Sequence, residues 1–445
     1  MNPLDLLNQP PYADVERIGM PRALLQHRYG PLWEAFFEAL GLSVVLSRPT
    51  DKDIVERGDA LSNDECCLAS KIYLGHVDSL LGACDAVFVP SVNNLGHFKS
   101  FCTKFQALPD LVANTFAERD VRLVTCLVDE LEGSDMKESL VSLAAGFGVA
   151  PREAKRAWKA ACRSQDQVER AAAAAQARVM RQLESDRLAH AVGKDAPVGI
   201  LLAAHPYLVH DPYLGGALAD MLERMGAVVL HADAVDRNQA AQASFEFSKT
   251  LPWIVNREII GAITMLYEQV DGIVLVSAFP CGPDSMTDDA IMRCIQGTPI
   301  LNLMIDAQSG TAGVETRVES FVDILRFQQN GQRNALLVLA IAVIIFLIDP
   351  RGGGAKSVIA VLGQYIHPQI KAQRLGELGE GLFSLHGQFL RSQGFRFVID
   401  HAVLHCRHCG SAEGQSQQER QRESSICFLH IRSASFLTAI GPAPN

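Results

Sequence analysis

The sequence predicts an α/β fold built from doubly wound parallel sheets. Short apolar runs rich in Val and Ile alternate with longer segments whose apolar residues recur about every 3.6 positions. The connections between them are short, which favours parallel strands joined by crossover helices. The clearest strand is Gly272–Ala278, and the Phe-Pro-Cys-Gly-Pro turn that follows it can continue neither a strand nor a helix.

Composition and charge limit the class of protein. The chain has 445 residues, a hydrophobic content of 48% and a net charge of −10, so we expect no nucleic-acid partner. The N-terminus lacks the basic and apolar regions of a signal peptide. Eleven scattered cysteines in a chain of this size do not suggest a disulfide framework. We therefore expect a cytoplasmic protein whose thiols are free to bind metal.

Residues 1–130 are predicted to form the first α/β lobe. An amphipathic helix over Pro21–Leu40 ends at Gly41, and a further helix is expected to begin at Thr50 as its cap. Residues 91–100 are predicted to form a loop. The predicted strands are Val15–Met20, Leu42–Leu46, Ala86–Pro90 and Val121–Val128.

A helical connector over residues 131–196 is predicted to lead to a second lobe over residues 197–327. The connector contains the long helix Pro151–Leu188. In the second lobe we expect Asp284 and Ser285 to cap the helix after Gly272–Ala278. The other predicted strands of this lobe are Val198–Ala203, Val228–His231 and Pro299–Ile305.

Residues 328–445 differ in style from the rest and form an atypical tail, interpreted as non-homologous or out of frame. Ala335–Ile348 is a run of 14 apolar residues, shorter than the roughly 18–20 that a spanning helix needs, so membrane insertion is not expected. His405–Cys409 resembles a metal knuckle, but it lacks a second ligand pair and is interpreted as a chance pattern.

Three cysteines, Cys67, Cys102 and Cys281, each lie where a loop enters a predicted helix. Thiolates from three separate segments could hold an iron–sulfur cluster with one iron left open for a substrate, although scattered core cysteines remain the alternative. Cys66 is the alternative to Cys67 as the ligand, because two adjacent cysteines cannot easily bind one iron. The remaining cysteines inside predicted elements are expected to be structural: Cys84, Cys126, Cys162 and Cys294.

His205 follows a predicted strand and is the candidate catalytic residue, able to bind a substrate oxygen or pass a proton, or else a packing residue. Lys104, Asp284 and Ser285 are the candidate substrate-binding residues, against the alternatives of a solvated lysine and a helix cap. Asp211 is expected to be a cap. No dinucleotide, P-loop or serine-hydrolase motif is found.

Several short motifs together resemble the acyl-CoA dehydratase activase-related proteins, relatives of the iron–sulfur subunits of 2-hydroxyacyl-CoA dehydratases and benzoyl-CoA reductases. The resemblance covers about residues 15–326. The motifs are Ile18–Leu24, Asp64–Leu68, Lys71–Val77, Cys102–Phe105, His205–Tyr207, Cys281–Ser285, Gly310–Gly313 and Thr316–Arg317.

This resemblance implies two flavodoxin-like lobes with a 4Fe–4S cluster between them, held by Cys67, Cys102 and Cys281. It also implies a separate ATP-dependent activase with its own cluster that delivers low-potential electrons, and an acyl-CoA substrate for a lyase or reductase. The sequence departs from the family pattern at Ala69, Thr103, Ala307 and Gln308. A non-catalytic scaffold or regulator of an activase complex is the alternative.

Overall fold

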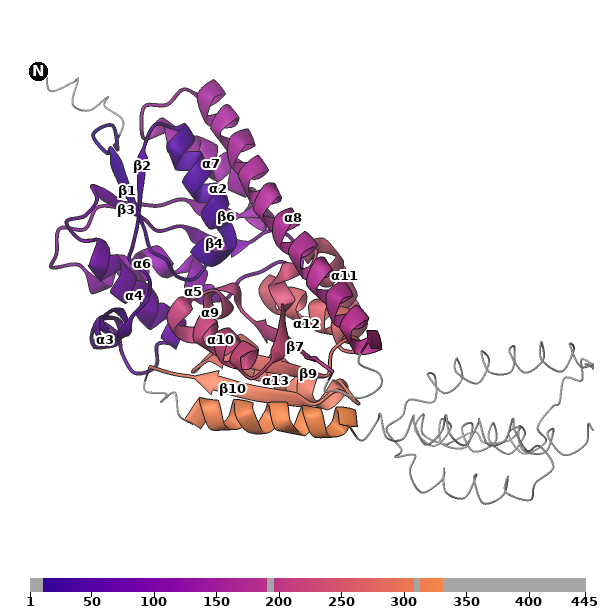
Figure 1. The fold of residues 1–445 in the computed structure, drawn as a ribbon. Coiled ribbons are helices and arrows are strands. Elements are labelled where there is room, and N and C mark those ends of the chain that lie inside the picture. The colour runs from indigo at the N-terminus through magenta and orange to yellow at the C-terminus, as the bar shows by residue number, and fades with distance from the viewer. Residues whose placement is uncertain (1–10, 190–195, 308–312, 331–445) are drawn as a thin grey trace, which may run out of the picture. The chain divides into compact units, whose positions relative to one another are not determined.

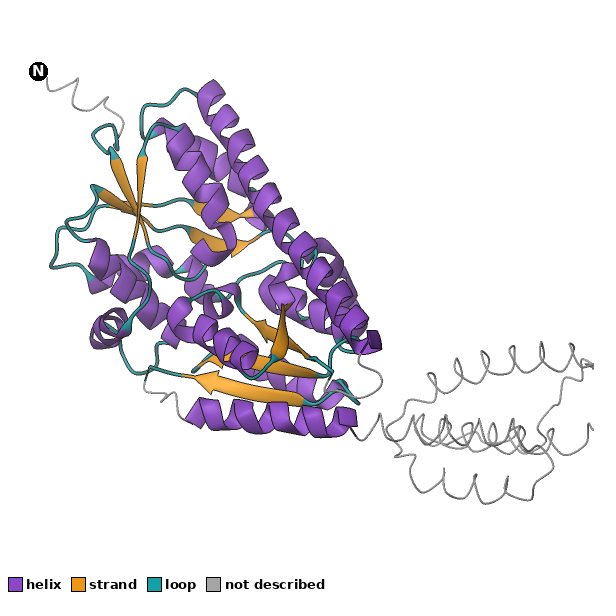
Figure 2. Cartoon of the chain, viewed as in Figure 1, coloured by secondary structure: helices purple, strands orange, loops and turns teal. Residues whose placement is uncertain are grey.

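The computed structural model describes residues 11–189, 196–307 and 313–330, and all of them lie within one compact unit. The predicted α/β class is confirmed, because parallel sheets alternate with many helices (Figures 1 and 2). The predicted tail, including Ala335–Ile348, lies outside the described residues. No described helix is both long enough and apolar enough to cross a membrane.

The first lobe contains a four-stranded parallel sheet with the order β2-β1-β3-β5. Its strands are β1 (Arg17–Met20), β2 (Ser43–Leu46), β3 (Ala86–Phe88) and β5 (Leu123–Val124), and its helices are α2 (Gln26–Ala39), α3 (Lys52–Ala60), α4 (Leu68–Leu80) and α6 (Leu108–Thr115). Ile18, Phe88 and Phe37 are almost fully buried, so the sheet and α2 share one apolar core.

A two-stranded parallel sheet extends this lobe toward the second one. It pairs β4 (Ser91–Asn94) with β6 (Leu127–Asp129), and the neighbouring helices are α5 (Thr103–Gln106), the 3₁₀ turn η1 (Glu130–Glu132) and α7 (Met136–Ala145). The prediction of a loop over residues 91–100 is therefore wrong at its start. The predicted strand Val121–Val128 divides into β5 and β6, which belong to different sheets.

The second lobe contains a parallel sheet with the order β10-β9-β7-β8. Every residue of β7 and β9 is buried, as expected for strands covered on both faces. The elements are β7 (Val198–Ala204), α9 (Pro206–Val209), the π turn η2 (Pro212–Gly216), α10 (Ala217–Arg224), β8 (Ala227–His231), η3 (Ala232–Ala234), α11 (Arg237–Phe247), α12 (Ile254–Leu266), β9 (Gly272–Ala278), α13 (Gly282–Cys294), β10 (Ile300–Ile305) and a helix over residues 313–330.

The long helix α8 (Pro151–Ala189) passes both lobes (Figure 1). Its Gln165 amide donates to the backbone oxygen of Arg28 in α2 at 2.8 Å, and its Gln176 amide donates to that of His231 in β8 at 2.9 Å. These two glutamines are about three turns apart on the same face of α8, and their buried side chains fasten the helix to an element of each lobe.

A buried polar interface joins the lobes directly. Arg28 of α2 forms a bidentate ion pair with Glu258 of α12, with Nη2 2.7 Å from Oε1. Both side chains are about one-tenth exposed or less. The second part of the polar interface is a chain of hydrogen bonds that runs through Ser47, His76, Thr50 and Asp211.

The hydrogen bond between Thr50 and Asp211 shows that one predicted helix cap is wrong. Asp51, not Thr50, caps α3, because its carboxylate accepts from the Ile54 backbone N–H at 2.9 Å. Thr50 instead donates to Asp211 across the interface. Asp211 is a cap as predicted, accepting from the backbone N–H groups of Tyr213 and Leu214.

Candidate metal centre between the lobes

The three candidate cysteines line one cavity between the lobes, although up to 214 positions separate them in the sequence. Cys67 and Cys102 come from the first lobe and Cys281 from the second. The other lining residues are mostly apolar: Leu24, Ala69, Ser70, Ser100, Phe101, Lys104, Phe105, His205, Tyr207, Trp253, Val255, Asn256 and Pro283. Cys66 is buried elsewhere, so Cys67 is the member of the adjacent pair that reaches the cavity.

Each of these cysteines is the residue immediately before a helix. Cys67 precedes α4, Cys102 precedes the one-turn α5, and Cys281 precedes α13. None of the three side chains caps its helix with a hydrogen bond. The N-termini of α4 and α13 carry partial positive charge, which would stabilise an anionic group bound at the cavity edge.

Backbone hydrogen bonds fix the cysteine segments to one another. The Leu68 N–H, the first of α4, donates to the carbonyl of Phe279 at 2.9 Å, which ties the Cys67 segment to the cis Phe279–Pro280 turn before Cys281. Ser100 donates to Pro252 at 3.0 Å and accepts from Ile254 at 2.9 Å. Because these bonds cross between the lobes, the relative positions of the three thiols do not depend on side-chain packing alone.

Burial disfavours a free thiolate at Cys281. Desolvation raises the pKa of this thiol far above its ordinary range, and the nearby Asp284 carboxylate raises it further. A buried thiolate beside a carboxylate needs a compensating positive charge. A coordinated metal ion would supply that charge, and the thiol would lose its proton on binding it. Cys67 has a polar neighbour as well, since its Sγ lies 3.3 Å from the Ser70 hydroxyl.

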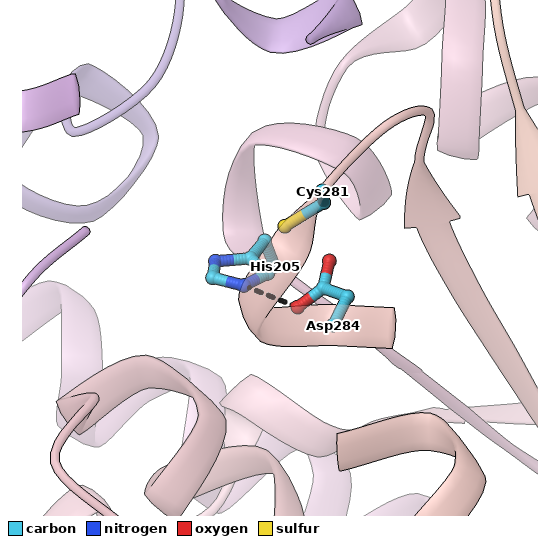
Figure 3. Close-up of side chains that lie close together, drawn as sticks. All are labelled: His205, Cys281 and Asp284. Atoms are coloured by element: carbon cyan, nitrogen blue, oxygen red, sulfur yellow. Dashed lines mark hydrogen bonds and ion pairs between the residues drawn. The ribbon is translucent and has the colours of Figure 1, made fainter. Parts of the chain in front are cut away.

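His205 and Asp284 form a buried pair next to Cys281 (Figure 3). The His205 ring bonds to the Asp284 carboxylate with an Nε2–Oδ1 distance of 2.9 Å, and it stacks on Tyr207 with ring centroids 4.9 Å apart. Asn256 donates to the same Oδ1 at 2.8 Å. Burial alone would raise the pKa of Asp284, but the His205 ring and these hydrogen bonds outweigh it and the pKa is lowered.

The helix α13, which follows Cys281, begins earlier in the sequence than predicted. Asp284 and Ser285 were expected to cap it, but α13 starts at Gly282 and Asp284 lies in its first turn. The Ser285 hydroxyl donates to the Cys281 carbonyl at 2.7 Å, so it serves its own helix. Lys104 is exposed at the cavity edge, where its ammonium could meet an anion.

Sequence reasoning missed several residues of this site. Trp253, Asn256 and Ser70 line the cavity but carry no motif that marks them as functional. A signal existed for Asn256, because Asn-Arg-Glu interrupts the otherwise apolar helix Ile254–Leu266. The four cysteines expected to be structural do not line the cavity, and burial raises the pKa of Cys126 to about 12, which keeps its thiol neutral.

The arrangement of the thiols bears on the kind of metal centre. Among the described residues, one set of three Cys, His, Asp or Glu side chains brings its ligand atoms within 4.8 Å of one another: His205, Cys281 and Asp284. The sulfurs of Cys67, Cys102 and Cys281 are therefore not all within 4.8 Å of one another. A polynuclear centre, whose thiolates bind different irons, suits such a spacing.

Comparison with known protein families finds a match for the first half of the chain. Residues 17–235 match the family described as "CoA enzyme activase uncharacterised domain". The matched region includes Cys67, Cys102 and His205, whereas Cys281 lies beyond its end. A comparison with curated proteins finds no match.

Proposed function

We propose, from the match of residues 17–235 to the family of CoA enzyme activase-related domains, that the chain is an iron–sulfur protein. In this proposal Cys67, Cys102 and Cys281 hold a 4Fe–4S cluster, and an ATP-dependent activase with its own cluster supplies low-potential electrons. When bound, such a cluster accepts and donates one electron at a time. The observation that carries the proposal is that three cysteines from distant segments line one cavity, and that none of their thiols is used in a helix-capping hydrogen bond.

The donor set fits this group. Thiolates are the usual ligands of iron–sulfur clusters, and three of them would bind three irons of a 4Fe–4S cluster and leave the fourth open to a substrate. The cavity around them is largely apolar, with Phe101, Phe105 and Trp253 among its lining residues, so it excludes water from the metal and its sulfurs. The N-termini of α4 and α13 would partly neutralise the negative charge that thiolate ligands bring.

Residues of the chain give this site an additional polar side. His205 is held by Asp284 and stacks on Tyr207, so its ring has a fixed orientation at the cavity. A fixed imidazole can bind a substrate oxygen or move a proton to it. Lys104 at the cavity edge could attract an anionic group such as the phosphates of an acyl-CoA. We propose further that the protein acts on an acyl-CoA substrate, as a lyase or a reductase.

Iron and sulfide analysis after anaerobic purification tests the proposal. We expect about four irons per chain in the wild-type protein and loss of nearly all of them in Cys281→Ala. Cys294→Ala is the matched control, because Cys294 lies in the same helix but is exposed and remote from the cavity lining. A colourless, folded wild-type protein would overturn the proposal and favour a scaffold or regulator of an activase complex.

A further inference from the structure

His205, Cys281 and Asp284 bring three different ligand types to one point (Figure 3). One ring nitrogen, the thiol sulfur and one carboxylate oxygen all lie within 4.8 Å of one another. Nitrogen, sulfur and oxygen ligands bound to one zinc-sized ion at 2.0–2.3 Å lie roughly 3–4 Å apart. Small rotations of these side chains would therefore complete the coordination.

Burial distinguishes this group from ordinary surface carboxylates. His205 is 6% exposed and Asp284 is 4% exposed. The second carboxylate oxygen of Asp284, Oδ2, is buried and accepts no hydrogen bond from a nitrogen or oxygen donor among the described residues, and the weakly donating Cys281 thiol is a neighbour of this carboxylate. An unpartnered buried carboxylate oxygen is costly, and a bound cation would satisfy it.

Neighbouring side chains already orient the ligands as the outer shell of a metal site does. Asn256 donates to Asp284 Oδ1 at 2.8 Å and is also 3.1 Å from the Thr287 hydroxyl. Tyr207 holds the His205 ring by stacking. Such partners fix the rotamers of metal ligands before the ion arrives.

We propose that His205, Cys281 and Asp284 form a mononuclear site for a divalent transition ion such as Zn²⁺ or Fe²⁺. Borderline ions of this kind accept mixed sulfur, nitrogen and oxygen ligands, whereas Mg²⁺ and Ca²⁺ prefer oxygen. Binding displaces the thiol proton of Cys281 to solvent and moves the proton of His205 from Nε2 to Nδ1, so that Nε2 and the Asp284 carboxylate exchange their hydrogen bond for two metal bonds. Three protein ligands leave a fourth position open toward the cavity that His205 and Cys281 line.

This site shares Cys281 with the proposed cluster but differs from it in every other ligand. The two occupants therefore exclude each other, and a zinc-loaded chain cannot assemble the cluster. The mononuclear site itself does not rest on the proposed function, since its ligands and their spacing stand without a cluster. Its consequence for cluster loading does rest on that function.

Titration of the cluster-free full-length protein with Co²⁺ tests the site, because cobalt bound to a thiolate gives a charge-transfer absorption band. We expect one Co²⁺ with thiolate absorption in the wild type, and at least 10–100-fold weaker binding in Asp284→Asn and in His205→Gln. Cys67→Ser and Cys102→Ser are the matched controls and should bind Co²⁺ as the wild type does. His205→Gln serves alone if Asp284→Asn does not fold, as judged by circular dichroism.

Two results would overturn the site. One is unchanged Co²⁺ affinity in folded His205→Gln, and the other is loss of the absorption band in Cys67→Ser or Cys102→Ser, which would mean that the ion uses the three cysteines. A second arm measures iron uptake after Zn²⁺ preloading, which should fall in the wild type and recover in His205→Gln. If no variant takes up iron while Co²⁺ binding follows the expected pattern, the cluster proposal fails and the mononuclear site stands.

Discussion

Two regions join the lobes of this protein, and they differ in how their polar atoms are satisfied. In the polar interface, His76 uses both ring nitrogens, with Ser47 at 2.8 Å and Thr50 at 3.0 Å, and Arg28 meets Glu258 with two hydrogen bonds, although its Nε has no partner among the described residues. In the cavity, three thiols cap no helix, and a buried carboxylate oxygen of Asp284 lacks a partner. Charged and polar side chains that pair across the interface hold the lobes together, whereas the cavity gathers thiols, an imidazole and a carboxylate, which are the types of group that bind metals.

This contrast separates stability from metal content. Substitutions in the polar interface should lower the free energy of unfolding without removing iron. Substitutions of the cavity thiols should remove iron with little change in the stability of the metal-free protein, since no protein group loses a hydrogen bond of its helix cap.

The largest stability effect is expected from Glu258→Gln. This change leaves the buried Arg28 guanidinium without its counter-charge, and breaking a buried pair in this way costs about 3–5 kcal/mol. Urea unfolding of the metal-free protein measures it. Glu246→Gln on the neighbouring helix α11 is the control, because Glu246 is exposed. Equal midpoints for the two variants would show that the ion pair does not hold the lobes.

A smaller effect is expected from pH. Burial lowers the pKa of His76 from 6.5 to about 3, so between these values the unfolded chain binds a proton that the folded protein does not. The contribution of His76 to the free energy of unfolding is therefore constant above about pH 6.5. Between about pH 6.5 and pH 3 the free energy of unfolding falls by about 1.4 kcal/mol for each unit of pH, because the unfolded state binds one more proton.

The variant His76→Gln isolates this contribution. It cannot take up the proton, so its unfolding free energy should depend less steeply on pH between 6.5 and 4 than that of the wild type. His97→Gln, at an exposed position, should keep the wild-type slope. Parallel slopes for wild type and His76→Gln would contradict the account of the buried histidine.

The smallest effect is expected inside the cavity, at Ser70. Its hydroxyl lies 3.3 Å from the Cys67 sulfur and would donate to it once the thiol is a metal-bound thiolate. Hydrogen bonds to cluster sulfurs stabilise the reduced state, so Ser70→Ala should lower the reduction potential by about 20–60 mV, the equivalent of one hydrogen bond. Redox titration measures the shift. Ser79→Ala, whose hydroxyl bonds a backbone carbonyl farther along α4, should leave the potential unchanged.

The sequence was sufficient for features that depend on local patterns. The strand Gly272–Ala278 is found with the predicted bounds because apolar residues fill a short run and Pro280 stops it. The positions of Cys67, Cys102 and Cys281 before helices follow from turn residues and apolar periodicity. The α/β class follows from the alternation of such elements.

Features that depend on distant pairing could not be predicted from the sequence. Thr50 had the residue type of a helix cap, and only the approach of Asp211 shows why Asp51 takes that role. The ion pair of Arg28 with Glu258 joins positions 230 residues apart, which no periodicity reveals. The hydrogen bond from Leu68 to Phe279 joins two backbone atoms, so it cannot be predicted from the types of the two side chains.

The electron paramagnetic resonance spectrum of the anaerobically reduced protein tests the central claim most directly. If Cys67, Cys102 and Cys281 hold one 4Fe–4S cluster, the wild-type protein should show the signal of a reduced cluster, and Cys102→Ser should lose it or change its shape. An iron-loaded wild-type protein whose spectrum is the same in Cys102→Ser would contradict the claim, because the Cys102 thiol would then take no part in binding the metal.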